Sequence, residues 1–192
     1  YTPTISDVVD YITTASLGNA ADFGNLAAAT GTSSGFSNQT RFVSATGSAP
    51  GYTNRIDYFT IASTGNATDF GDASTAGTDG GANANPTRGV HAGGFASPAD
   101  GVVNHIDYFT IMSAGNSTDF GNLAAAIQMM AWASSTTRGV SCGGSTSPSA
   151  GNDVNTMQYI EYATTGDTTD FGDLATTKEQ AAGISNGKRR IV

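Results

Sequence analysis

The hydrophobic positions of this chain fall into short runs separated by turn residues, which is the pattern of β-strands. The run Asn54–Ile61 is rich in β-branched and aromatic residues, and Ser63–Asn66 after it supplies Gly and Asn for a tight turn. Apolar side chains occupy both alternating faces of the run, with Ile56 on one face and Phe59 on the other. We therefore predict a strand that is covered on both sides, as in a sheet stacked between two similar sheets.

The same pattern recurs four times along the chain. The tripeptide Asp-Phe-Gly occurs at spacings of 47, 50 and 51 residues, beginning at Asp22, Asp69, Asp119 and Asp170. In every copy a turn Gly lies four residues before this Asp, and a Tyr lies eleven residues before it. A repeat of about 50 residues predicts one domain, 1–192, made of similar supersecondary units. The approximate units are 35–84, 85–134, 135–174 and a divided unit composed of 1–34 and 175–192.

A diglycine also recurs between units. Arg88–Gly94 ends in a diglycine, as the run before Gly143-Gly144 does, and a variable loop, a Tyr-bearing strand and a strand with Phe120 follow it. In this order of elements the unit resembles the kelch repeat. The first copy departs from the pattern at Ala45–Gly47, and Phe stands where kelch repeats usually have Trp. The resemblance implies an all-β, kelch-like β-propeller of four blades, each of four antiparallel strands, with the two termini sharing one blade. The alternative is that the chain is a piece of a longer array.

The exact residues of the repeat also point to a class of proteins. Asp-Tyr-Phe-Thr-Ile at 57–61 and 107–111, with Thr-Gly-Asn-Ala-Thr-Asp-Phe-Gly at 64–71, is similar to tandem repeats in virion structural and tail-fibre-like proteins of marine bacteriophages, notably those infecting cyanobacteria. This resemblance implies a virion or extracellular location and a non-enzymatic structural or attachment function. The implied partners are other structural proteins, copies of the same chain, or a cell-surface glycan.

Composition excludes several classes of function. The 16 acidic and 8 basic residues leave a net charge of -8, whereas a nucleic-acid-binding face is basic. No apolar run approaches the roughly 20 residues that span a bilayer, so membrane insertion is not expected. The single Cys142 and two His residues are too few for a zinc site with three or four His/Cys ligands, and we expect no cofactor.

Short matches to catalytic motifs lack the sequence context that the chemistry needs. Asp-Phe-Gly binds magnesium in protein kinases, but here it occurs four times without a Gly-rich loop, a strand Lys or a catalytic loop. Gly31–Gly35 matches the nucleophile elbow of hydrolases without a following helix. Copper-dependent oxidases built on kelch propellers need His ligands and a Tyr-Cys crosslink, which makes a lone Cys142 a poor match.

Two further groups of side chains are weighed as candidate sites. His91 and His105 occur in one copy only, so ordinary satisfied side chains are the first interpretation and a pocket or weak metal contact the alternative. The loop acids Asp72, Asp79 and Asp100 would be calcium ligands only if the fold gathered them, because no calcium-loop spacing is present.

Half of the basic residues recur once per unit, as Arg41, Arg88, Arg138 and Arg189. A partly buried guanidinium favours a bidentate acceptor, so we predict that each Arg pairs with a repeated carboxylate. The candidate acceptors are Asp22, Asp69, Asp119 and Asp170, or Asp10, Asp57 and Asp107. The alternative is that these Arg side chains extend into solvent. In either case the recurrence indicates a structural role.

Two regions differ between copies and are therefore candidates for individual function. The loops after the diglycines, Phe95–Val103 and Ser145–Val154, have their counterpart in Ser48–Thr53 and would lie on one face of a propeller. The candidate partner-binding residues in them are Tyr52, Phe95, Pro98, Asp100, Pro148 and Asp153. Exposed aromatics among these would favour a carbohydrate-binding, lectin-like function. Ile127–Trp132 is either core filling for its unit or an exposed apolar contact patch.

Overall fold

The structure, a computed structural model, describes residues 5–48, 50–149, 151–186 and 189–191. These residues form small antiparallel sheets and contain no helix, which confirms the all-β prediction. It follows that no helix in these ranges is long and apolar enough to cross a membrane.

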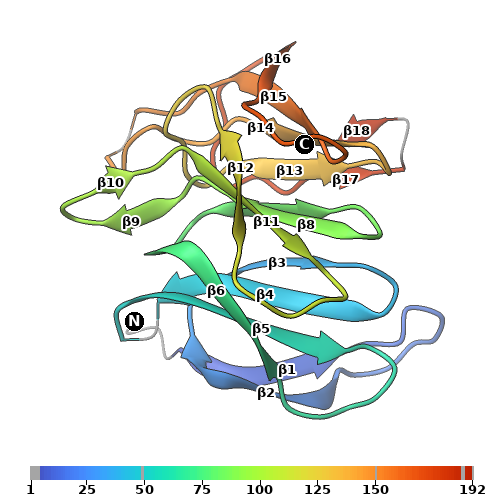
Figure 1. The fold of residues 1–192 in the computed structure, drawn as a ribbon. Coiled ribbons are helices and arrows are strands. Elements are labelled where there is room, and N and C mark those ends of the chain that lie inside the picture. Colours follow the sequence, from blue (N-terminus) through green and yellow to red (C-terminus); the bar gives the residue numbers. More distant parts are fainter. Residues whose placement is uncertain (1–4, 49, 150, 187–188, 192) are drawn as a thin grey trace.

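Three four-stranded sheets form the middle of the molecule (Figure 1). The first contains, in hydrogen-bonded order, β3 (Ser34–Ser37), β4 (Arg41–Ser48), β5 (Tyr52–Thr60) and β6 (Thr68–Gly77). The second contains β7 (Gly81–Ala84), β8 (Arg88–Ala92), β11 (His105–Thr110) and β12 (Thr118–Asn122). The third contains β13 (Ala131–Ser134), β14 (Arg138–Cys142), β15 (Thr156–Glu161) and β16 (Thr169–Asp173). Each sheet is one copy of the sequence repeat.

Three two-stranded sheets complete the fold. They are β1 (Ser6–Tyr11) with β2 (Ala21–Thr30), β9 (Phe95–Ser97) with β10 (Gly101–Val102), and β17 (Ile184–Ser185) with β18 (Arg190–Ile191). In Figure 1 the sheets stack, with β1–β2 at the bottom and β17–β18 at the top right. The two end sheets therefore lie at opposite ends of the stack. The predicted sharing of one sheet by the two termini is absent from the described ladders, because β1 pairs with β2 and β18 with β17.

Strand β5 coincides with the run that the hydrophobic pattern singles out. Ile56 is fully buried and Phe59 is 3% exposed, from alternate faces of the strand, so the expected cover on both sides is present there. Ile61, just beyond the strand, is 44% exposed, whereas its counterpart Ile111 in the next repeat is fully buried. The first sheet is thus less completely covered on the side that faces β1–β2 than on the side that faces the second sheet.

The repeated motifs join neighbouring sheets. Gly115 N donates a hydrogen bond to Phe70 O at 2.6 Å, and Ser117 N donates to Asp72 O at 2.8 Å. Asp72 N in turn donates to the side-chain Oδ1 of Asn116 at 3.1 Å. The same three bonds link β1–β2 to the first sheet and the second sheet to the third. The Asp-Phe-Gly motif of one repeat is therefore fastened to the Gly-Asn or Gly-Asp turn of the next.

A second repeated position, one residue before the strand Tyr, also bridges sheets. The carboxylate of Asp107 accepts hydrogen bonds from Ser74 N at 3.0 Å and Ser74 Oγ at 2.8 Å. Asp57 and Gln158 accept backbone N–H donors of the preceding sheet in the same way. These side chains satisfy backbone donors that adjacent strands do not reach.

The repeated Arg residues have partners other than those predicted. Three of them lie over the Tyr ring of the neighbouring strand, at 4.1 Å for Arg41 on Tyr58, 4.3 Å for Arg88 on Tyr108 and 4.5 Å for Arg138 on Tyr159. The ring face attracts the cation electrostatically, so no carboxylate is required.

The hydrogen bonds and ion pairs of these Arg residues also differ from the predicted Arg–Asp pairs. Arg88 Nη1 donates to Tyr162 O at 2.6 Å, and in the described part of the chain no carboxylate forms an ion pair with it. Arg138 pairs with Glu161 at 2.7 Å, and Asp57 pairs with Arg55 at 3.1 Å. The Asp side chains of the Asp-Phe-Gly motifs are exposed, namely those of Asp22, Asp69, Asp119 and Asp170.

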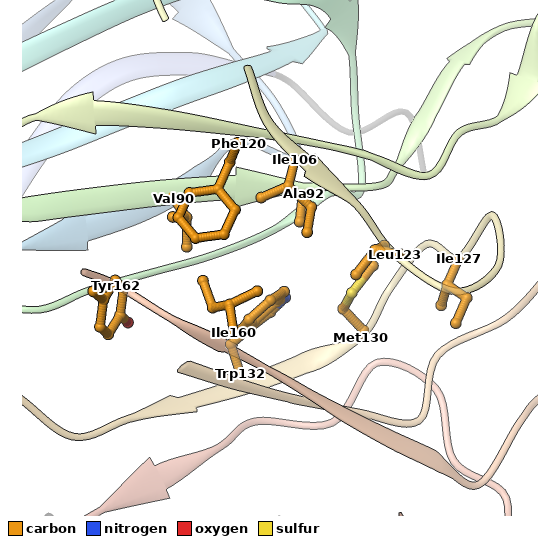
Figure 2. Packing of buried hydrophobic residues seen from close by; sticks show 10 residues of the cluster. All are labelled: Val90, Ala92, Ile106, Phe120, Leu123, Ile127, Met130, Trp132, Ile160 and Tyr162. Carbon is orange, nitrogen blue, oxygen red and sulfur yellow. The ribbon is translucent and has the colours of Figure 1, made fainter. Parts of the chain in front are cut away.

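The core lies between sheets. Figure 2 shows the cluster between the second and third sheets, where Phe120 and Ile106 face Trp132 and Ile160. Ile127, Met130 and Trp132 are 3%, 6% and 8% exposed. The segment Ile127–Trp132 is thus core filling, the first of its two interpretations.

Candidate functional site

The loops that differ between repeats lie against the turns that lead from one sheet to the next. The backbone of Thr78, in the turn between β6 and β7, pairs with Phe95. Gln128, in the turn between β12 and β13, pairs with Ser145 in the same way. Because these turns and loops contact each other, one face of the stack carries both the variable loops and the inter-sheet turns.

The structure brings two of the predicted loop residues together. The rings of Tyr52 and Phe95, from different repeats, have centroids 5.8 Å apart at an interplanar angle of 61°. Tyr52 is 40% exposed and Phe95 is half-buried. Their contact places an aromatic pair on this face.

The other four loop residues are distributed over two separate loops. Pro98 and Asp100 are exposed at the β9–β10 hairpin, where Ser97 Oγ donates to Asp100 Oδ2 at 2.7 Å. Pro148 is exposed in the β14–β15 loop, and half-buried Asp153 forms a backbone bridge in that loop. These residues shape the two loops without converging on one point.

The inter-sheet turns contain a feature that sequence reasoning missed. Each carries a non-Gly residue in the left-handed conformation, with φ of 50° at Thr32, 57° at Asp79, 55° at Met129 and 53° at Gln180. Hydrogen bonds run from turn to turn, from Met129 N to Asp79 O at 2.8 Å and from Gln180 N to Met129 O at 3.0 Å. Each residue follows the Phe of Asp-Phe-Gly by nine positions, and this constant offset was the available signal.

These turns line a pocket of about 270 Å³. Its lining residues are Thr32, Ser33, Asp79, Gly80, Met129, Met130, Gln180 and Ala181. Burial raises the pKa of the half-buried Asp79, and a hydrogen bond involving Thr78 partly opposes this rise. The pocket combines a carboxylate, hydroxyls, an amide and thioethers, which suits a ligand with both hydrogen-bonding groups and apolar surface.

The remaining candidate residues do not assemble a catalytic or metal site in the described ranges. No group of three or more His, Cys, Asp or Glu side chains there is placed to hold a metal ion. His91 is buried with Nε2 3.2 Å from Thr46 Oγ1, and burial lowers its pKa to about 4. Gly31–Gly35 connects two strands rather than a strand and a helix, and Ser34 Oγ within it donates to Gly80 O at 2.6 Å.

The left-handed turns make a prediction at Gln180, which is exposed. Gln180→Val is expected to lower the free energy of unfolding by about 1–2 kcal/mol, because a β-branched residue is strained at positive φ. Gln180→Asn should cost little, since Asn tolerates this conformation. Denaturant unfolding of the two variants measures the difference. Glu179→Val, at an exposed neighbour without positive φ, is the control, and an equal loss there would contradict the assignment.

Comparison with known proteins identifies no relative of this chain. No protein-family model matches the chain, and a search of curated proteins gives no match. The likeness to kelch repeats and to phage structural repeats therefore rests on the motifs of the sequence itself.

Proposed function

We propose that this chain is a non-enzymatic binding and display module, whose stacked sheets hold one variable face in place for a partner protein or glycan. One observation carries the proposal. Thr32, Asp79, Met129 and Gln180 have the same backbone conformation at equivalent positions but four different side chains. A constant frame with varied side chains is the arrangement by which a scaffold presents a recognition surface.

The contacts between the sheets support this function, because they hold the loop-bearing face in a fixed position. The same inter-sheet hydrogen bonds recur at the three junctions from β1–β2 to the third four-stranded sheet, and β3, β7, β13 and β17 neighbour one another in turn along the stack. We take this arrangement as an arc of a kelch-like propeller, in which each sheet is a blade. The four-bladed ring of the sequence prediction would require the two end sheets to meet.

The proposed setting is a phage particle or another extracellular assembly. The motif resemblance supports it, as does a chain with a net charge of -8, which disfavours nucleic acid as the partner. A glycan is the second candidate partner, and the specific observation that favours it is the Tyr52–Phe95 pair on the loop face. Aromatic faces offer apolar surface with a polar edge, which suits the mixed faces of a sugar ring.

A glycan array followed by calorimetry on its hits tests the glycan candidate. Tyr52→Ala and Asp79→Ala are expected to weaken binding at least about tenfold, roughly the effect of losing one 1.4 kcal/mol contact. Met112→Ala is the control, because exposed Met112 follows the opposite end of β11 from the loop face. An array without hits, or equal weakening by all three variants, rejects the glycan.

Site-specific photo-crosslinking within the native assembly tests the protein candidate. A photoreactive residue at position 79 should crosslink to a partner chain more often than one at position 112. Equal yields from the two positions would contradict the display face.

A further inference from the structure

A second pocket lies between the second and third sheets, at the opposite end of the strands from the loop face. It has a volume of about 350 Å³ and is lined by the β7–β8 turn, the β13–β14 turn and the end of β15. The loop face carries the turns that precede β7 and β13, and this pocket lies beside the turns that follow them. We propose that the pocket binds a carboxylated sugar, such as a uronic acid, through Arg88 and three Thr hydroxyls.

Arg88 gives the pocket a positive charge that no carboxylate of the described ranges neutralises. Its guanidinium lies over the Tyr108 ring at 4.3 Å, and Nη1 donates to Tyr162 O at 2.6 Å. Nε and Nη2 form no hydrogen bond with a described residue, and the side chain is half-buried in the pocket wall. A guanidinium held in this way keeps two N–H groups for a carboxylate, which accepts paired hydrogen bonds from Arg.

The next repeat shows a carboxylate bound to the equivalent guanidinium. Arg138 lies over the Tyr of its neighbouring strand at 4.5 Å, and its Nε and Nη2 donate to Glu161 Oε1 at 2.9 and 2.7 Å. The strand register places Glu161 opposite Arg138. The same register places the uncharged Thr110 opposite Arg88. Arg88 therefore has the surroundings of Arg138 without its carboxylate, and a ligand carboxylate would supply one.

Three Thr hydroxyls in the lining suit the hydroxyl groups of a sugar. Thr87, Thr136 and Thr137 are all exposed. The Thr87 hydroxyl donates to Asn85 Oδ1 at 3.2 Å, which leaves its oxygen as an acceptor. The Thr136 hydroxyl has no hydrogen-bond partner among the described residues, so it can both donate and accept. The pocket volume is at the lower end of the range for small-molecule sites, about 300–1,000 Å³, which suits a small ligand.

The charges around the pocket favour a ligand with a single negative charge. Glu161 also lines the pocket and is paired with Arg138. Together with Arg88, these groups are two guanidinium cations and one carboxylate, which leaves a net charge of +1. A dianion such as a phosphate ester would be repelled more strongly by the Glu161 carboxylate. The chain as a whole carries a charge of -8, but salt screens distant carboxylates beyond about 8 Å at physiological ionic strength.

The junction between the first and second sheets has the same framework and a different lining. There Asn38 Nδ2 donates to Pro86 O at 3.0 Å. In the pocket the equivalent bond runs to Thr136 O at 3.1 Å. Pro86 therefore stands where the pocket has the Thr136 hydroxyl, and Met112 stands where the pocket is lined by the smaller Ala163. The neighbouring junction thus provides a matched control within the same chain.

Calorimetry with a panel of uronic-acid and sialic-acid oligosaccharides, each compared with its methyl ester, tests the ligand class. The ester keeps the hydroxyls of the sugar and removes its charge. The native chain is expected to bind at least one acid about tenfold more tightly than the corresponding ester, because only the acid pairs with Arg88. Absence of binding across the panel, or equal affinity for acid and ester, overturns the proposal.

Arg88→Gln is expected to weaken binding of the acid at least about tenfold, because the ligand loses its cationic partner. Arg41→Gln is the matched control. Arg41 has the same contacts at the neighbouring junction, over Tyr58 at 4.1 Å and with Ile111 O at 3.0 Å. Equal weakening by the two variants would reflect a shared effect on the fold and would overturn the proposal.

Two further variants change the pocket and leave Arg88 in place. Ala163→Met and Thr136→Pro introduce the residues that the neighbouring repeat has at these positions, so the fold accommodates them. Each is expected to weaken binding of the acid about tenfold, by filling the pocket or by removing a hydroxyl. Tyr52→Ala should leave this binding unchanged, which separates the site from the glycan candidate on the loop face. Unchanged affinity of both pocket variants, or loss of binding in Tyr52→Ala, contradicts the assignment.

Discussion

Gly121→Ala is expected to lower the free energy of unfolding by about 2 kcal/mol more than Gly172→Ala, although both change the last residue of an Asp-Phe-Gly motif. Both glycines have positive φ, 143° and 123°, so both variants incur backbone strain of about 1–3 kcal/mol. A Cβ on Gly121 would also lie 2.4 Å from the carbonyl C and O of Gly166 in the next sheet. A Cβ on Gly172 would approach only Met157 Cε, at 3.9 Å.

The difference between the free energies of unfolding of these two variants measures the contact between sheets, because the backbone strain of the two variants is similar. Denaturant unfolding measures both, and Gly51→Ala is the reference, since Gly51 has neither a positive φ nor an atom within 4 Å of its Cβ position. Equal losses for Gly121→Ala and Gly172→Ala would mean that close approach of the sheets does not explain the repeated Gly.

Lowering the pH from 6.5 to about 4 is expected to remove about 3 kcal/mol of stability through His91 alone. Burial is the main cause of the lowered pKa of His91, and His105 lowers it further, whereas Asp107 raises it. The unfolded chain therefore binds a proton at His91 at a higher pH than the folded chain does. The contribution of neutral His91 to the free energy of unfolding is complete above pH 6.5 and is lost as the pH falls through the folded-state pKa of about 4.

Urea unfolding at a series of pH values between 4 and 7 measures this loss. His91→Gln keeps a polar side chain beside Thr46 and should flatten the dependence on pH, whereas His105→Gln should leave most of it in place. A wild-type chain with constant stability over this range would contradict the burial of a neutral imidazole.

Local pattern was sufficient to predict the repeat and its Tyr-bearing strands. β5, β11 and β15 coincide with the Tyr-bearing runs because alternation and turn residues act over a few positions along the chain. The role of Asp-Phe-Gly could not be predicted in this way. Its partners, such as Gly115 N on Phe70 O, lie about one repeat away and depend on how the sheets stack.

The Arg prediction was wrong for a related reason. Sequence showed that Arg and carboxylates recur at the same period, but it did not show which group faces the guanidinium. The strand register places Val90 opposite Tyr108 and brings the Tyr ring beneath Arg88. The Asp-Phe-Gly carboxylates remain in solvent. Recurrence therefore identified the residues that matter structurally without identifying their contacts.

Of the candidate site, too, the sequence predicted some residues and the structure revealed others. Loop variation drew attention to Tyr52 and Phe95, and the structure places their rings against each other. The left-handed residues Thr32, Asp79 and Met129 have no side-chain type in common, so composition could not reveal them. Only their constant offset from Asp-Phe-Gly was present in the sequence.

By itself the sequence determined an all-β chain built on a repeat of about 50 residues, because strand and turn preferences are local and the motifs recur in register. Only the tertiary structure decided that β1–β2 and β17–β18 lie at opposite ends of the stack, that Arg stacks on Tyr, and that the inter-sheet turns line a pocket. These features depend on contacts between residues about 50 positions apart. Their geometry follows from the direction in which one sheet packs on the next, which no local pattern specifies.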